Sequence, residues 1–250
     1  MPHHVSEGPD DAAALVLSSS LGTTLAMWEP QLSRLAGRLR VVRYDHRGHG
    51  GSPVPDGPYS VAELGRDVLE LADGLGLDRF SFCGLSLGGL VGMWLASEAP
   101  ERVERLVLCC TAPAFPPAKQ WLDRAAKVRA EGTEAIADAV LGRWFTPAAD
   151  EALVGRFRAM LAATPREGYA GCCEALAGAD LHDRLAAIEA PTLVVTGAGD
   201  PVAPPARGDA LAASLPAARH VTVPGAHVPS AEYPEPFTQH VLAHLTEETA

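Results

Sequence analysis

The sequence has no long hydrophobic run and no leader pattern at its start. No apolar stretch approaches the roughly 18 residues that a membrane-spanning helix needs. The first eleven residues lack the basic segment followed by an apolar one that marks a secretory signal. We therefore expect a soluble, cytoplasmic protein that does not act on a membrane.

The sequence also has few cysteines and fewer basic than acidic residues. The five cysteines are an odd number and include the adjacent pairs Cys109–Cys110 and Cys172–Cys173, which is not the spacing of a disulfide framework. We expect them to be small core residues in a reducing compartment. The net charge of −11 would repel nucleic acids and anionic membranes at long range, so neither is expected as a partner. An anionic substrate would need nearby arginines to overcome this long-range repulsion.

Apolar runs of strand length alternate with helical patterns along the 250 residues. This alternation predicts one α/β domain with a mostly parallel sheet and right-handed crossovers. The expected strands cover residues 12–17, 39–44, 103–110, 191–196 and 219–223, and a further strand opens the stretch 80–90. The expected helices cover residues 28–36, 59–74, 205–215 and 234–245, and another helix follows the stretch 80–90 and ends near Pro100.

A stretch of about 75 residues interrupts this alternation. Residues 113–187 show helical patterns with breaks at Gly132, Pro147, Pro165 and Gly178, and no strand pattern. We predict a core formed by residues 1–112 and 188–250, with residues 113–187 inserted as a helical lid that excludes water and shapes the pocket.

The motif Gly84-Leu85-Ser86-Leu87-Gly88 lies between an apolar strand pattern and a helical pattern. It is typical of a nucleophile elbow, in which a serine projects above the sheet while glycines let the backbone segments cross closely. The positive end of the following helix would face an oxyanion formed at Ser86. The alternative interpretation is an ordinary glycine-flanked strand-to-helix turn.

Two further residues complete a possible catalytic triad. Asp200 follows the strand at 191–196, and His227 follows the last strand, so both lie at the sheet edge where α/β proteins bind ligands. Taken singly, each could be an ordinary turn aspartate or core histidine. The chain order of serine, acid and histidine is that of an α/β-hydrolase, which favours Ser86 as nucleophile, Asp200 as acid and His227 as base.

An oxyanion hole needs two backbone N–H groups, one from the residue after the nucleophile and one from the loop after the first parallel strand. Leu87 and Leu21 occupy these positions. The alternative is that Leu21 only packs beneath the lid.

The remaining polar and aromatic candidates can be interpreted in more than one way. The pairs His46/His49 and His240/His244 lack the further ligands of a zinc site, so no metal is expected. Asp45, Arg47 and His49 are expected to brace the loop beside the elbow. Three lid aromatics could form either lid core or the ceiling of the pocket. Three lid arginines are expected to be mostly surface residues, but one of them could bind a substrate carboxylate. These residues are Trp121, Trp144, Phe145, Arg124, Arg129 and Arg143.

With these motifs the chain resembles the α/β-hydrolases and, more narrowly, the 3-oxoadipate enol-lactonases of aromatic catabolism. The resemblance rests on residues 17–23 with 27–31, 42–50 and 84–89, and on the lid segments 135–147 and 167–173. The lid segments carry the narrower resemblance, because many esterases share the elbow and the triad. The family usually has asparagine where Ser19 stands, so the hydrogen bonding behind the oxyanion loop is expected to differ.

The resemblance implies an α/β-hydrolase fold, with a mostly parallel sheet flanked by helices and a helical lid. Only about a dozen mostly polar residues precede Leu15, so we expect a shortened N-terminal hairpin with one edge strand missing. It also implies hydrolysis of 3-oxoadipate enol-lactone, a small anionic lactone, by the Ser86, His227 and Asp200 triad through an acyl-enzyme without a cofactor. Trp144 would line the pocket, and Arg143 is our candidate for the substrate carboxylate.

Two kinds of alternative stay open. The same machinery could serve a general carboxylesterase, a cofactor-free perhydrolase or a carbon–carbon bond hydrolase. A non-catalytic binding module could also be built on this fold, because a fold does not fix a function.

Overall fold

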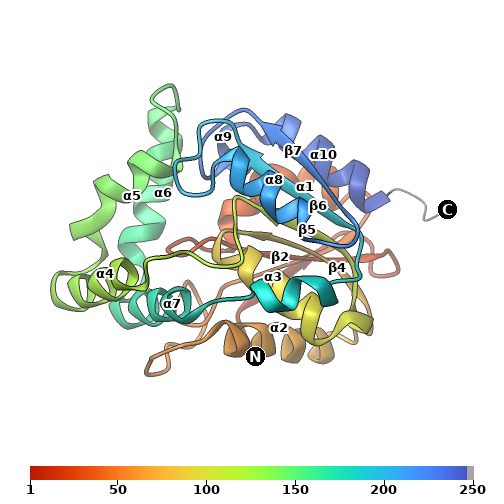
Figure 1. Cartoon of the computed structure of the whole chain (residues 1–250), viewed down its shortest axis with the longest axis horizontal. Coiled ribbons are helices and arrows are strands. Elements are labelled where there is room, and N and C mark those ends of the chain that lie inside the picture. Colours follow the sequence, from red (N-terminus) through yellow and green to blue (C-terminus); the bar gives the residue numbers. More distant parts are fainter. Residues whose placement is uncertain (247–250) are drawn as a thin grey trace.

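The computed structural model describes residues 1–246, and its centre is a seven-stranded sheet (Figure 1). The strands follow the order β1-β3-β2-β4-β5-β6-β7, and β1 alone is antiparallel to its neighbour. Their bounds are β1 His4–Glu7, β2 Ala14–Ser18, β3 Arg40–Tyr44, β4 Phe80–Leu85, β5 Val103–Cys109, β6 Thr192–Gly197 and β7 Ala218–Val223.

Helices cover both faces of this sheet, and α1 packs on α10 while α2 packs on α3 (Figure 1). The α-helices are α1 Glu29–Leu35, α2 Val61–Gly74, α3 Leu87–Glu98, α4 Ala118–Glu131, α5 Ala137–Trp144, α6 Glu151–Ala163, α7 Arg166–Gly178, α8 Pro205–Ala213, α9 Pro229–Glu232 and α10 Pro234–Thr246. Short 3-10 turns are η1 Leu25–Trp28, η2 Pro100–Arg102, η3 Thr133–Ile136 and η4 His182–Ala187.

The central strands are mostly apolar because helices cover them on both faces. Every residue of β2, β4 and β6 is buried. The chain leaves β2 toward β3 on one side and leaves β4 toward β5 on the other, while β2 and β4 are themselves neighbours. Such a reversal opens a crevice beyond the carboxyl ends of the two strands, which is where α/β folds bind ligands.

The segment between β5 and β6 is helical, as expected. Its helices α4 to α7 gather at one end of the molecule, on the left in Figure 1. Arg129 of α4 holds α7 through ion pairs with Glu167 and Glu174, at 2.6 Å from each carboxylate. Within this group α4 packs on α7, and α5 packs on α6.

The N-terminal segment contains a strand that the sequence analysis did not assign. His4–Glu7 pairs antiparallel with Tyr44–Val41, so β1 supplies an edge strand from mostly polar residues. The shortened hairpin expected from the sequence is thus one antiparallel strand at the edge of the sheet. Backbone pairing to β3 forms this strand, which is why no apolar run marks it.

Two further expectations concern the cysteines and the membrane. All five cysteines are buried and unpaired, which confirms that they are core residues. Among residues 1–246, no helix combines the length and the hydrophobicity that crossing a bilayer requires.

Candidate active site

The elbow places Ser86 between the end of β4 and the start of α3. Its backbone has φ 57° and ψ −108°, a strained conformation for a residue with a side chain. The Ser86 N–H donates to the Cys109 carbonyl at 2.8 Å, and the Thr111 hydroxyl donates to the Ser86 carbonyl at 2.8 Å. The neighbouring strand β5 and the residues after it therefore hold the strained turn in place.

His227 and Asp200 form a buried hydrogen-bonded pair. The distance from His227 Nδ1 to Asp200 Oδ2 is 2.8 Å, and each residue is 3% exposed. Burial opposes ionisation of Asp200, but His227 and the N–H groups of Val202 and Ala203 outweigh burial and hold the carboxyl pKa below its usual value. The ionised carboxylate fixes the tautomer of His227 with its proton on Nδ1, leaving Nε2 free to accept a proton.

Ser86 and His227 line one cavity without a hydrogen bond between them in the described part of the chain. Such contacts are often long in unliganded sites and shorten when the substrate binds. Cys110 lies behind the pair, and its Sγ, a carboxylate oxygen of Asp200 and a ring nitrogen of His227 lie within 4.8 Å of one another. Burial and the Asp200 charge raise the pKa of the Cys110 thiol, which favours a protonated thiol over a metal ligand.

The loop after β2 brings the backbone of Leu21 to the same cavity. Leu87 is the first residue of α3, so its N–H has no partner within the helix. Within residues 1–246, no protein group accepts a hydrogen bond from the N–H of Leu21. Ser19, where the resembling family usually has asparagine, donates its hydroxyl to the Thr24 carbonyl of the same loop at 3.3 Å.

Two buried histidines hold this loop from behind. Gly22 N–H donates to His49 Nε2 at 3.0 Å, and His46 Nε2 donates to the Ser19 carbonyl at 2.9 Å. Burial lowers the pKa of each histidine to about 4, and the proximity of His46 adds to the effect on His49. Both rings are therefore neutral near pH 7, which the acceptor role of His49 Nε2 requires.

The residues expected to brace the loop after β3 do so. Asp45 accepts hydrogen bonds from the backbone N–H groups of Leu25 and Gly51, and Arg47 forms an ion pair with Asp67 at 2.6 Å. With His49 they fix the segment beside the elbow, and none of the three lines the cavity.

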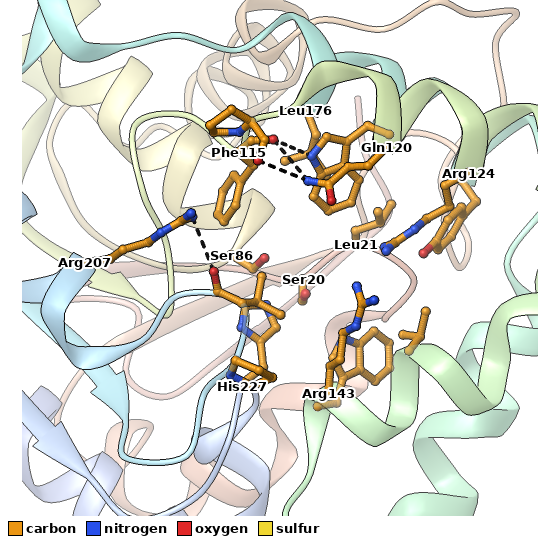
Figure 2. Close-up of a pocket in the computed structure, with 17 residues that line it drawn as sticks. Ser20, Leu21, Ser86, Phe115, Gln120, Arg124, Arg143, Leu176, Arg207 and His227 are labelled. Atoms are coloured by element: carbon orange, nitrogen blue, oxygen red, sulfur yellow. Dashed lines mark hydrogen bonds between the residues drawn. The ribbon is translucent and has the colours of Figure 1, made fainter.

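A cavity of about 360 Å³ lies above Ser86, between the sheet edge and α4, α5 and α7 (Figure 2). Trp121, Trp144 and Tyr169 give it an aromatic wall from three helices of the insertion. Phe145 instead packs on Phe157, with ring centroids 5.0 Å apart, so it belongs to the core of the insertion. The sequence had left both roles open for the aromatic residues.

Three arginines converge on this cavity. Arg124 and Arg143 come from α4 and α5, and Arg207 comes from α8. None forms an ion pair with a carboxylate of residues 1–246, although most other arginines of this acidic chain do so. No aspartate or glutamate within that range lines the cavity either. Uncompensated guanidinium groups in a polar-lined cavity favour an anionic ligand.

The insertion is hydrogen-bonded to the loop that carries His227. The Trp144 carbonyl accepts from Val228 N–H at 3.0 Å. The Glu232 carboxylate accepts from the backbone and hydroxyl of Thr146 and from Ala226 N–H. The end of α5 is thus tied to the residues directly before and after the histidine.

The structure brings most of the expected site residues together and adds others. Ser86, His227, Leu21, Arg143 and Trp144 line the cavity, with Asp200 directly behind His227 and Leu87 at the helix start. Arg129 does not contribute, because it pairs with carboxylates of α7. Sequence reasoning missed Arg207 and Glu232; the only available signal was their position in helices directly after Asp200 and His227.

Comparisons with known proteins identify the fold family and similar enol-lactonases. The family model described as the alpha/beta hydrolase fold matches residues 13–234. The 3-oxoadipate enol-lactonase 2 of Acinetobacter baylyi is 40% identical over 244 residues, which cover 96% of this chain and 91% of the relative. The crystal structure of the enol-lactonase from Burkholderia xenovorans LB400 superposes with a TM-score of 0.96 at 44% identity, covering 98% of this chain and 96% of that one.

The names of other relatives refer to a second activity. A protein of Rhizobium rhizogenes named for carbamate hydrolysis is 35% identical, over 94% of this chain and 93% of the relative. Relatives at similar coverage therefore differ in the bond that their names assign to them.

Proposed function

Because this chain belongs to the alpha/beta hydrolase fold family, we propose that it hydrolyses 3-oxoadipate enol-lactone to 3-oxoadipate through Ser86, His227 and Asp200. One observation carries the proposal: a buried His–Asp pair and a strained serine open onto a cavity lined by three arginines that have no carboxylate partner within residues 1–246. Enol-lactonases among its relatives, at 40% and 44% identity, support the choice of substrate.

In the acylation step the Ser86 hydroxyl attacks the lactone carbonyl. His227 Nε2 takes the hydroxyl proton, and Asp200 stays ionised and stabilises the imidazolium. The N–H groups of Leu21 and Leu87 stabilise the developing oxyanion. The hydrogen bonds of His46 and His49 hold the loop of Leu21 in position.

Collapse of the intermediate breaks the bond between the carbonyl carbon and the ring oxygen. The leaving group is an enolate, which departs more easily than an alkoxide. His227 gives it the proton taken from Ser86, so the imidazole is neutral again, and the enol becomes the ketone by proton exchange with water. Water then gives a proton to His227 and attacks the acyl carbon. The carbon–oxygen bond to Ser86 breaks, and His227 returns the proton to the serine oxygen.

The substrate carries one carboxylate away from the reacting ester. Arg143 and Arg124 point into the cavity from the insertion, opposite the sheet edge (Figure 2). Either guanidinium can bind this carboxylate by donating a pair of hydrogen bonds to it. Trp121 and Trp144 flank them with apolar surface for the ring. Positive charge at this wall offsets the repulsion of an anion by a chain of net charge −11.

The test is a kinetic assay of the purified protein on the enol-lactone, followed by loss of its absorbance. We expect turnover of the lactone, a clear preference over simple esters and carbamates, and a higher KM for the lactone methyl ester, which lacks the carboxylate. Ser86→Ala should lower kcat at least about 10³-fold because the nucleophile is gone. The exposed Ser33→Ala is the matched control and should retain full activity.

Other outcomes would redirect the assignment. Faster hydrolysis of carbamates or simple esters than of the lactone would place the chain among the other hydrolases of the family. Full activity of Ser86→Ala would exclude Ser86 as the nucleophile. Inactivity on every substrate class would favour a binding module.

A further inference from the structure

Arg207 borders two cavities. It lies in the first turn of α8, seven residues after Asp200, and lines the cavity above Ser86. A second cavity of about 230 Å³ lies beside the first, and Arg207 and Pro116 line both. The second cavity is mostly apolar, with His182 and Ser214 as its other polar side chains.

The position of Arg207 is unfavourable for a structural arginine. The first turn of a helix carries partial positive charge, so a cation there is destabilised. The side chain is exposed and has no carboxylate partner in the described part of the chain. Its hydrogen bond from Nη1 to the Val202 carbonyl is long, at 3.4 Å. The surrounding protein thus leaves most of the guanidinium donors available for an anion.

The three arginines of the cavity lie on two sides of the nucleophile. In Figure 2 the Arg207 side chain lies on one side of Ser86, and the side chains of Arg124 and Arg143 lie on the other. A single carboxylate can engage only one of these sides. A ligand with a carboxylate at each end of a short chain can engage both, with its middle above Ser86.

We propose that Arg207 forms a second carboxylate subsite, which binds the carboxylate that hydrolysis creates. This rests on the proposed function in one respect, that the product carries two carboxylates. When water attacks the acyl carbon and the bond to Ser86 breaks, the acid released there ionises. The new anion then lies between the nucleophile and Arg207, while the original carboxylate remains at Arg124 and Arg143. Arg207 therefore binds product and other short dicarboxylates, and contributes little to binding of the intact lactone.

The test compares two six-carbon acids by isothermal titration calorimetry: adipate, with two carboxylates, and hexanoate, with one. The wild-type protein should bind adipate more tightly. Arg207→Gln should raise the Kd of adipate about tenfold, as expected for loss of one charge-assisted contact, and change that of hexanoate less than about twofold. Arg207→Lys should be intermediate, since it keeps the charge but not the planar fork. Arg38→Gln is the matched control, because exposed Arg38 precedes β3 at the opposite edge of the sheet.

Three results would overturn the subsite: equal affinity of the wild type for the two acids, equal weakening of both by Arg207→Gln, or no effect of that substitution. The titration does not depend on turnover. An adipate preference that requires Arg207 in a protein inactive on the lactone would refute the proposed function and leave the subsite standing. Lactone turnover with no effect of Arg207→Gln on adipate would do the reverse.

Discussion

At the scale of single residues, the elbow depends on two glycines, Gly84 and Gly88, which have no side chain. A Cβ on Gly84 would lie 2.1 Å from the Gly88 carbonyl oxygen, and one on Gly88 would lie 2.3 Å from the Ser18 carbonyl oxygen. These obstacles are backbone atoms of α3 and β2, which cannot turn aside as a flexible side chain can. The two glycines therefore let the helix approach the strands closely enough to hold Ser86 in its strained conformation.

We predict that Gly84→Ala lowers the free energy of unfolding by at least about 2 kcal/mol, because the added methyl forces backbone shifts in a packed core. Hydrolytic activity should fall with it, since Ser86 would move. Denaturant unfolding and kcat/KM measure the two effects. Gly155→Ala in α6 is the matched control: its Cβ meets nothing within 4 Å, so it should stabilise by about 0.5–1 kcal/mol. Equal behaviour of the two variants would contradict the packing argument.

At the scale of elements, the insertion and the His227 loop form one hydrogen-bonded unit. Trp144 and Thr146 at the end of α5 bond to Val228 and, through Glu232, to Ala226. The position of His227, the proposed catalytic base, thus depends on a helix inserted far from it in the sequence. A displacement of α5 would move the base and the aromatic wall together.

Replacing Glu232 with alanine should therefore affect both stability and catalysis. Three donors from Thr146 and Ala226 would lose their acceptor, and we expect a loss of about 1–3 kcal/mol in the free energy of unfolding. The kcat should fall about tenfold or more as His227 loses its fixed position, and Glu232→Gln, which keeps an acceptor oxygen, should recover part of the loss. Glu235→Ala provides the comparison, because its surface pair with Arg34 contributes little. A wild-type kcat in Glu232→Ala would show that the hydrogen bonds of Glu232 do not position His227.

The sequence predicts those parts of the fold that local patterns encode. Apolar runs mark the central parallel strands β2, β4 and β6, because burial on both faces favours such runs. The G-x-S-x-G motif and the chain order of Asp200 and His227 indicate which residues meet at the sheet edge. Strand β1 leaves no such pattern, since it forms by backbone pairing with β3.

The parts of the site that escape sequence reasoning depend on contacts between distant segments. Thr146 and Glu232 are 86 residues apart, and no local pattern links them. Arg207 looks like any charged residue on an exposed helix until the cavities on either side of it are known. Likewise, Arg124, Arg129 and Arg143 are equivalent in sequence, and only packing shows that Arg129 is held by Glu167 and Glu174.

At the scale of the whole molecule, stability should depend on pH through the two buried histidines. The folded-state pKa of His46 and of His49 is about 4, below the ordinary value of 6.5. Between these values the unfolded chain binds more protons than the folded one, so stability falls as pH decreases from about 6.5 toward 4 and is level above 6.5 with respect to these groups. The depressed pKa of Asp200 acts in the same direction in more acidic solution.

We predict a loss of about 2 kcal/mol or more in the free energy of unfolding between pH 7 and pH 5, from roughly 1.4 kcal/mol for each pKa unit of difference. Urea unfolding at a series of pH values measures it. His49→Gln should flatten the slope by about one proton, because an amide can accept from Gly22 N–H without titrating. Ser33→Ala, which removes no titratable group from an exposed position, should leave the slope unchanged. An unaltered slope in His49→Gln would mean that other groups control the acid sensitivity.

The hydrogen bonds between α5 and the His227 loop also set the boundaries for exchanging lids among relatives. A transplanted lid segment that ends before Trp144 would replace Trp121 of the aromatic wall while keeping Trp144, Tyr169 and the host's own contacts to Val228 and Glu232. A transplant that extends past Thr146 must carry a partner for Glu232, or the host histidine loses its support. An exchange of lids in this scaffold should therefore keep Trp144 and Thr146 with the core, so that the hydrogen bonds to the His227 loop are preserved.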